Sequence, residues 1–131
     1  MAVMSKGRVL VVDDEADVRR SVRLILTKAE YDVDDAEDPE VGATLVKSGV
    51  NKMPLNAIIT DLNMPTVNEI IVIPYLHSQF PSCPIIVLSG SKMLERSAKL
   101  FKQAGVQFLA KPVNKEQLLG ALSIAMNKGG S

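Results

Sequence analysis

The sequence lacks the features that define several classes of protein. Its single cysteine, Cys83, excludes an intrachain disulfide and a thiolate metal cage and leaves a reducing compartment as the expectation. No stretch approaches the roughly 20 apolar residues of a membrane span, and residues 1–7 lack the apolar core of a signal peptide. We therefore expect a cytoplasmic protein with no membrane segment.

Excess charge is also missing, because 15 basic residues balance 15 acidic ones. Binding to a phosphate backbone through bulk charge needs more Lys and Arg, so no direct nucleic-acid partner is expected. A length of 131 residues with 47% hydrophobic residues fits one domain with one core. We expect a single domain over residues 1–131, with a core at about 8–126 and flexible tails at 1–7 and 127–131.

Four short apolar runs are typical of strands that are covered on both faces, since most of them show no polar alternation. These runs are Arg8–Val12, Leu55–Thr60, Pro84–Leu88 and Val106–Ala110. A fifth segment, Tyr31–Ala36, is rich in Asp and fits a half-exposed edge strand. The acidic run that continues from it to Asp38 is interpreted as a solvated edge.

Segments with helical spacing separate these strands. They are Val18–Ala29, Pro39–Val46 with Asp38 as N-cap, Asn68–Phe80, Ser91–Ala104 and Glu116–Met126. Pro74 costs about 3 kcal/mol inside a helix, so the third helix is expected to start late, near Pro74, or to be kinked there. Strand and helix alternate five times, which predicts a doubly wound parallel α/β sheet with helices on both faces.

Polar side chains follow the strands at the points where they end. Asp13 and Asp14 come after the first apolar run, Asp61 after the second, Ser89 after the third and Lys111 after the fourth. The carboxyl ends of parallel strands converge on one crevice. The sequence therefore predicts a single site with three carboxylates, a hydroxyl and an ammonium.

Clustered carboxylates need a cation or protons, and Mg²⁺ suits a site with few carboxylates and several waters. Lys111 would hold a phosphoryl oxygen, and the Ser89 hydroxyl would donate to another. Asp61 fits a nucleophile, because carboxylates form aspartyl phosphates. Mg²⁺ and Lys111 would neutralise the transferring group, which is most of what phosphoryl transfer requires.

Four stretches in this order resemble the receiver domains of bacterial two-component response regulators, of the chemotaxis-regulator type. They are Val9–Glu15, Asp61–Pro65, Ile85–Gly90 and Lys111–Pro112, and the resemblance extends over Arg8–Met126. It implies a flavodoxin-like (βα)5 fold with strand order 2-1-3-4-5.

The resemblance also implies a role for each residue of the site. Asp61 would accept the phosphoryl group and bind Mg²⁺ together with Asp14 and the backbone carbonyl of Asn63, while Asp13 would bind through water. Ser89 and Lys111 would contact the phosphoryl group. Ser89 and an aromatic residue, Phe108, would form a switch, and the Lys111–Pro112 bond would be cis.

The function that this family implies is a switch and not a turnover enzyme. A sensor histidine kinase or a phosphotransfer protein would supply the phosphoryl group. The face formed by residues 92–104, 106–110 and 116–126 would then change and bind an output partner or a second copy.

Two residues depart from the family pattern and leave an alternative open. Glu69 stands where the family usually has glycine, and Pro74 follows in the expected third helix. The alternative is a receiver-like interaction domain that acts without phosphorylation. An Mg²⁺-dependent phosphatase is disfavoured, because Asn63 stands where such enzymes carry a second acid.

Overall fold

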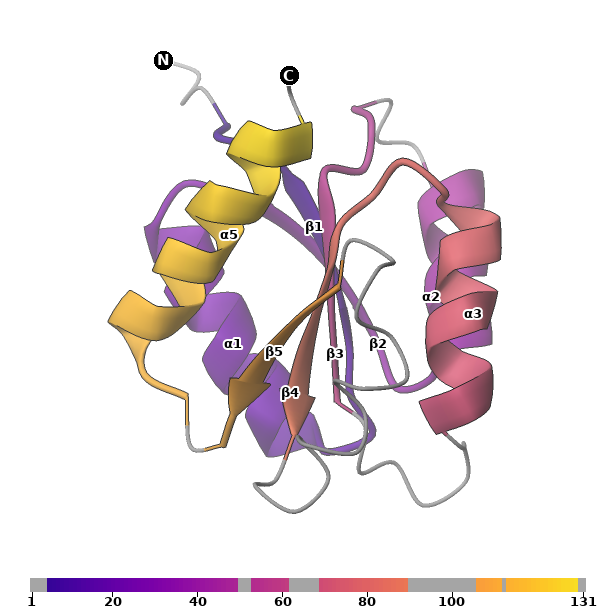
Figure 1. Cartoon of the computed structure of the whole chain (residues 1–131), viewed down its shortest axis with the longest axis horizontal. Coiled ribbons are helices and arrows are strands. Elements are labelled where there is room, and N and C mark those ends of the chain that lie inside the picture. Colours follow the sequence, from indigo (N-terminus) through magenta and orange to yellow (C-terminus); the bar gives the residue numbers. More distant parts are fainter. Residues whose placement is uncertain (1–4, 50–52, 62–68, 90–105, 112, 130–131) are drawn as a thin grey trace.

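One parallel sheet of five strands forms the centre of the molecule (Figure 1). The computed structural model describes residues 5–49, 53–61, 69–89, 106–111 and 113–129. The strands are β1 (Arg8–Val12), β2 (Asp32–Ala36), β3 (Ala57–Asp61), β4 (Ile85–Ser89) and β5 (Val106–Ala110). Their order is β2-β1-β3-β4-β5, which confirms the predicted flavodoxin-like topology.

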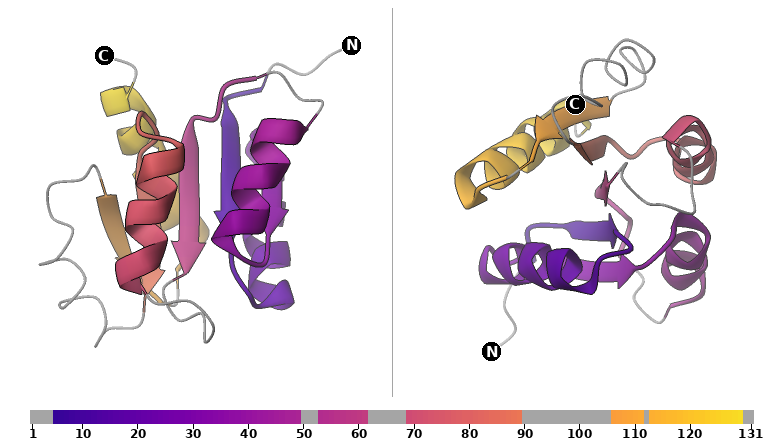
Figure 2. Two further views of the ribbon diagram at one scale, coloured as in Figure 1. Left: turned by 90° about the vertical axis from the view of Figure 1, so that its right-hand side faces the viewer. Right: turned by 90° about the horizontal axis from the view of Figure 1, so that it is seen from below.

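Helices cover both faces of the sheet, as Figure 2 shows in its right-hand view. They are α1 (Ala16–Lys28), α2 (Pro39–Ser48), α3 (Glu69–Gln79) and α5 (Lys115–Gly129). The helices α1 and α5 pack on one face, and α2 and α3 pack on the other. No helix in these described ranges combines the length and apolarity that a membrane crossing needs. The predicted helix Ser91–Ala104 lies outside the described residues.

The central strands carry continuous apolar runs because both of their faces are covered. Every residue of β1 and of β3 is buried, whereas β2 is half-buried along most of its length and lies at the edge, as predicted. The strands β3 and β4 each extend one residue further than predicted. Asp61 and Ser89 are therefore the last residues of their strands and do not follow them.

The third helix begins at Glu69, so the expectation that it starts near Pro74 is wrong. Val72, Ile73 and Leu76 are at most 1% exposed, and Pro74 lies on the exposed side. Burying one such apolar side chain is worth about 1.5–3 kcal/mol. Three of them outweigh the cost of about 3 kcal/mol for a proline inside a helix.

The acidic run is only in part the solvated edge that the sequence predicted, because Glu37 is exposed whereas Asp34 and Asp35 are partly buried and paired with Arg side chains. The carboxylate of Asp34 accepts from Arg8 Nε at 2.6 Å, and that of Asp35 accepts from Arg23 Nη1 at 2.7 Å. Asp38 is the N-cap of α2, as predicted, and accepts a backbone N–H of its first turn. The parallel register of β1 and β2 brings Arg8 next to β2, which a one-dimensional pattern cannot reveal.

Candidate functional site

The carboxyl ends of the strands bring charged side chains to one edge of the sheet. Val12 of β1 pairs with Thr60 of β3, so Asp13 and Asp61 follow as neighbours one step further along. Lys111 comes directly after β5. Two carboxylates and an ammonium therefore lie together at the carboxyl edge of the sheet, as the rule for parallel sheets predicts.

Asp61 and Lys111 form an ion pair at this edge. The Lys111 ammonium donates to Oδ2 of Asp61, whose side chain is fully buried, while 27% of the Lys111 side chain stays exposed. Burial of an unpaired carboxylate is costly, and the contact with Lys111 offsets that cost. A potential nucleophile and a potential phosphate ligand are thus in direct contact.

Asp13 is held through its backbone and through one of its two carboxylate oxygens. Its N–H donates to the carbonyl of Ala36 at 3.0 Å. Its Oδ1 accepts the N–H of Glu15 at 2.9 Å, and its carbonyl accepts from Arg19 Nη1 at 2.7 Å. The side chain is buried, yet Oδ2 has no hydrogen-bond partner among the described residues. A buried carboxylate oxygen without a partner calls for a ligand.

Burial raises the pKa of Asp13 from 3.8 to about 6, and the negative charge of Asp61 adds to the increase. The N–H of Glu15 and the positive charge of Lys111 oppose it. The site therefore holds more negative charge than its environment favours. A further cation beside Oδ2 would relieve that imbalance.

The donors present fit a hard divalent cation. Asp13 and Asp61 offer carboxylate oxygens, and Asp14 lies next in the chain, half-buried. Within the ranges that the structure describes, no group of three acidic, His or Cys side chains is arranged to hold a metal ion. Mg²⁺ tolerates such a site, since it binds through one or two carboxylates and keeps several waters.

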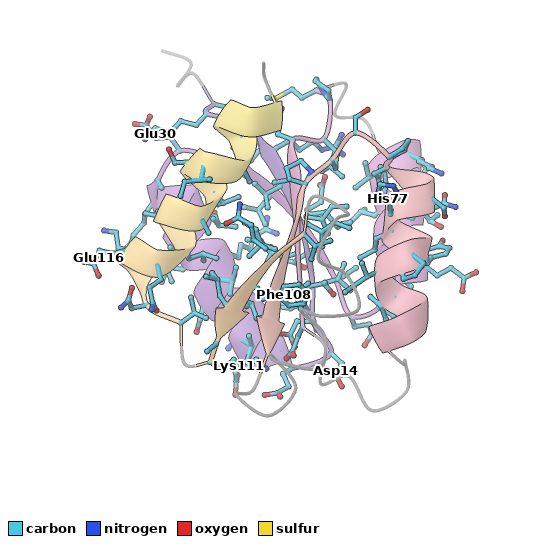
Figure 3. The ribbon with its side chains drawn as sticks, in the orientation of Figure 1. Asp14, Glu30, His77, Phe108, Lys111 and Glu116 are labelled. Atoms are coloured by element: carbon cyan, nitrogen blue, oxygen red, sulfur yellow. The ribbon has the colours of Figure 1, made fainter. Side chains whose placement is uncertain are left out.

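The other predicted residues are placed only in part. Asp14 and Lys111 both lie at the end of the sheet to which the strand arrows point (Figure 3). Ser89 is the last residue of β4. Phe108, in the middle of β5, is half-buried against the core under α2 and α3. Asn63, and the bond to Pro112 that was predicted to be cis, lie outside the described residues.

One contact of the site was not predicted from the sequence. Arg19 is off the apolar stripe of α1 and looks like one more surface charge of that helix, along with Arg20 and Arg23. Only the structure shows that its side chain turns back to the Asp13 carbonyl.

The fold is an α/β domain in which charged side chains gather at the carboxyl edge of a parallel sheet. The model of the response regulator receiver domain family matches residues 9–123. The chain belongs to this family, the receiver domains of two-component response regulators.

Curated relatives and solved structures agree with this assignment. The transcriptional regulatory protein PrrA of Mycobacterium tuberculosis is 29% identical over 128 residues, which are 98% of this chain and 53% of PrrA. Response regulator protein PilR of Pseudomonas aeruginosa is 24% identical over 123 residues, 94% of this chain and 27% of PilR. The chain thus spans about half or less of the length of these relatives.

The chemotaxis response regulator CheY4 of Vibrio cholerae is 28% identical in sequence and superposes with a TM-score of 0.73 over 94% of this chain and 99% of that one. A receiver domain protein from Clostridium thermocellum, 23% identical, superposes with a TM-score of 0.82 over 95% of this chain and 97% of that one. The second similarity concerns the fold alone.

Proposed function

We propose that the domain accepts a phosphoryl group on Asp61 in an Mg²⁺-dependent reaction and acts as a switch, not as a turnover enzyme. The observation that carries the proposal is the arrangement at the strand ends. A buried Asp61 carboxylate contacts Lys111. Beside it, Asp13 offers a buried oxygen that has no partner among the described residues. This is the donor set that phosphoryl transfer to a carboxylate needs.

The proposed donor is a phosphohistidine of a sensor histidine kinase or of a phosphotransfer protein. A carboxylate oxygen of Asp61 attacks phosphorus, the O–P bond forms, and the N–P bond breaks with its electron pair left on the imidazole. Lys111 holds a phosphoryl oxygen and offsets the added charge. Mg²⁺, when bound, would supply the remaining neutralisation of the transferred group.

The proposed metal ligands follow the family resemblance. Asp61, Asp14 and the backbone carbonyl of Asn63 would bind Mg²⁺ directly, and Asp13 would bind through a water molecule. The Asp13 Oδ2 supports the last assignment, because a metal-bound water would satisfy a buried acceptor without bringing another charge into contact with the ion.

Transmission of the phosphorylated state is proposed to run through Ser89 and Phe108. Phe108 belongs to β5, the outer strand of the sheet, and is half-buried, so it has room to change its burial. The surface altered would include β5, α5 and residues 92–104, and an output partner or a second copy would bind there. Hydrogen exchange with and without a stable phosphoryl mimic tests this step. Changes confined to residues 32–38 would contradict it.

The donor, the output partner and the cytoplasmic location are proposals for the whole protein. PrrA and PilR carry names of regulators, and each is longer than this chain. We propose a cytoplasmic location because the single cysteine favours a reducing compartment.

Incubation with a small-molecule phosphodonor and Mg²⁺, followed by intact mass, tests phosphorylation. We expect the wild-type chain to gain one phosphoryl group and Asp61→Asn to gain none, since the amide is not a nucleophile. Asp17→Asn is the matched control, because Asp17 is a first-turn acid of α1 whose side chain is 96% exposed. If the wild-type mass does not change although Mg²⁺ binds, the interaction domain that acts without phosphorylation becomes the better reading.

Titration calorimetry of the unphosphorylated protein with Mg²⁺ tests the ligand assignment. We expect weak binding to the wild type, no binding to Asp14→Ala and weakened binding to Asp13→Ala, because a direct ligand contributes more than a water-mediated one. Equal affinity of the two variants would show that the direct and indirect roles are wrongly assigned.

A further inference from the structure

Arg19 reaches from α1 to the backbone of the candidate site. Its Nη1 donates to the carbonyl oxygen of Asp13 at 2.7 Å, six positions earlier in the chain. Side chains of a helix lean toward its N-terminus, so an Arg one turn inside α1 is well placed to reach back over the helix start. The backbone N–H of Arg19 donates to the carbonyl of Glu15 at 3.0 Å, which also fixes the Arg19 backbone to the segment between β1 and α1.

Helix stability does not explain an Arg at this position. A positive charge near the start of a helix opposes the helix dipole, which favours acidic residues there. The side chain of Glu15, the N-cap residue of α1, makes no capping bond, and the Glu15 N–H donates to Oδ1 of Asp13 instead. Arg20, the next residue, is 79% exposed and pairs only loosely with Asp17 at 3.6 Å. Arg19 is half-buried, which points to a different role.

The contact completes the immobilisation of Asp13. With the N–H, Oδ1 and carbonyl each hydrogen-bonded, Oδ2 is the one polar atom of Asp13 for which the described residues provide no partner. The Asp13 carbonyl is also part of the peptide unit that leads into Asp14. Fixing this carbonyl fixes the start of Asp14 as well.

We propose that Arg19 is a positioning residue that holds the Asp13 carbonyl and thereby preorganises Asp13 Oδ2 and Asp14 for a divalent cation. The inference rests on the proposed Mg²⁺ binding and adds a residue that does not touch the ion. Loss of the Arg19 side chain should therefore change the affinity for Mg²⁺ in the direction opposite to that expected from its charge alone. Removing a nearby positive charge alone strengthens cation binding, whereas releasing the carbonyl weakens it.

Titration calorimetry with MgCl₂ on the full chain compares Arg19→Gln with Arg20→Gln, which removes the same charge from the same helix. We expect Arg19→Gln to raise the dissociation constant about tenfold, the lower end of what loss of an outer partner does to a metal site. Arg20→Gln should bind as tightly as the wild type or more tightly. Arg19→Lys, which keeps the charge and one donor, should recover part of the loss. Binding by Arg19→Gln that equals or exceeds that of Arg20→Gln would overturn the proposal.

A measurement on the metal-free protein separates this inference from the proposed function. The ¹³C resonance of the Asp13 carbonyl and the amide resonance of Glu15 should shift in Arg19→Gln and stay in place in Arg20→Gln. Unchanged resonances in Arg19→Gln would overturn the role of Arg19 while leaving Mg²⁺ binding untouched. No Mg²⁺ binding by the wild type would instead overturn the proposed function, together with the metal role of Arg19.

Discussion

One buried charge opens strand β1 and another directly follows the strand, and the two are paired with other groups to different extents. Arg8 opens the strand and is 3% exposed, while Asp13 follows its last residue and is 1% exposed. Both charges have been removed from water, which is expensive unless partners replace the water. The two sites therefore lie at the two ends of one strand, and each carries the cost of removing a charge from water.

The Arg8 end is closed by protein groups. Its guanidinium donates to Asp34 at 2.6 Å and to the carbonyl of Met53 at 2.9 Å, with a longer contact of 3.5 Å to the carbonyl of Val46. Its backbone N–H donates to Asn56 Oδ1 at 2.8 Å. These contacts join β1 to β2, to the end of α2 and to the segment before β3, so Arg8 is a structural clamp.

The Asp13 end is left open. One of its carboxylate oxygens has no partner among the described residues, and burial raises its pKa to about 6. A saturated buried charge stabilises one arrangement of the chain, whereas an incompletely paired charge reserves capacity for a ligand. The comparison shows that burial of a charge does not by itself distinguish a structural role from a ligand-binding one, because the two buried charges differ in how fully they are paired.

The largest effect on stability is expected at the closed end. Arg8→Met leaves the carboxylate of Asp34 and two backbone carbonyls without their donor, and should lower the free energy of unfolding by about 3 kcal/mol. Urea denaturation measures the loss. Arg23→Met breaks the more exposed pair with Asp35 and should cost under about 1 kcal/mol. Similar losses in the two variants would contradict the role of Arg8 as a clamp.

Replacement of the buried charge at the Asp13 end should raise the free energy of unfolding, whereas replacement of Arg8 should lower it. The folded-state pKa of Asp13, about 6, lies above its ordinary value of 3.8, so ionisation of Asp13 destabilises the metal-free fold as pH rises from about 4 to 6. Above that range, Asp13→Asn should be more stable than the wild type by at most about 3 kcal/mol. Below about pH 4 this advantage should vanish, because Asp13 is protonated there in both the folded and the unfolded wild type.

Urea denaturation at several pH values, without metal, measures this advantage. Asp17→Asn, at an exposed carboxylate, should show no comparable pH dependence. Added Mg²⁺ should stabilise the wild type more than Asp13→Asn. If the metal-free wild type has a higher free energy of unfolding than Asp13→Asn above pH 6, ionised Asp13 does not destabilise the fold.

The smallest effect is expected at Glu30, which Figure 3 shows at the end of the sheet opposite Lys111. Glu30 has φ of 73° and closes α1 in a Schellman arrangement, in which the N–H of Tyr31 donates to the carbonyl of Leu26 at 3.0 Å. Glu30→Gly should raise the free energy of unfolding by about 1 kcal/mol, since glycine adopts this conformation without strain. Glu30→Ala keeps the Cβ atom and should bring no such gain in urea denaturation. Equal effects of both variants would rule out backbone strain at Glu30.

Prediction from the sequence succeeded where a local pattern has one structural solution. The bounds of β1 and β5 were predicted as they are observed, although β5 is half-buried and not covered like β1. The polar edge strand was predicted at Tyr31–Ala36, one residue longer than β2. The start of the third helix was wrong because the cost of Pro74 was counted without the burial of its neighbours Val72 and Ile73. Packing between α3 and the sheet is not visible in a periodic pattern.

The sequence by itself determined which polar residues lie at or just after the carboxyl ends of the strands, and hence that Asp13, Asp61 and Lys111 would gather at one edge of a parallel sheet. Periodicity and chain order suffice for that, because strand ends of a parallel sheet lie at the same side. Only the tertiary structure decided which buried charges are saturated. Arg8 and Asp34 are 26 positions apart, and Lys111 and Asp61 are 50 apart. Their pairing, and the lack of a partner for Asp13 Oδ2 in the part of the chain that the structure describes, depend on strand register and side-chain reach, which no local sequence pattern encodes.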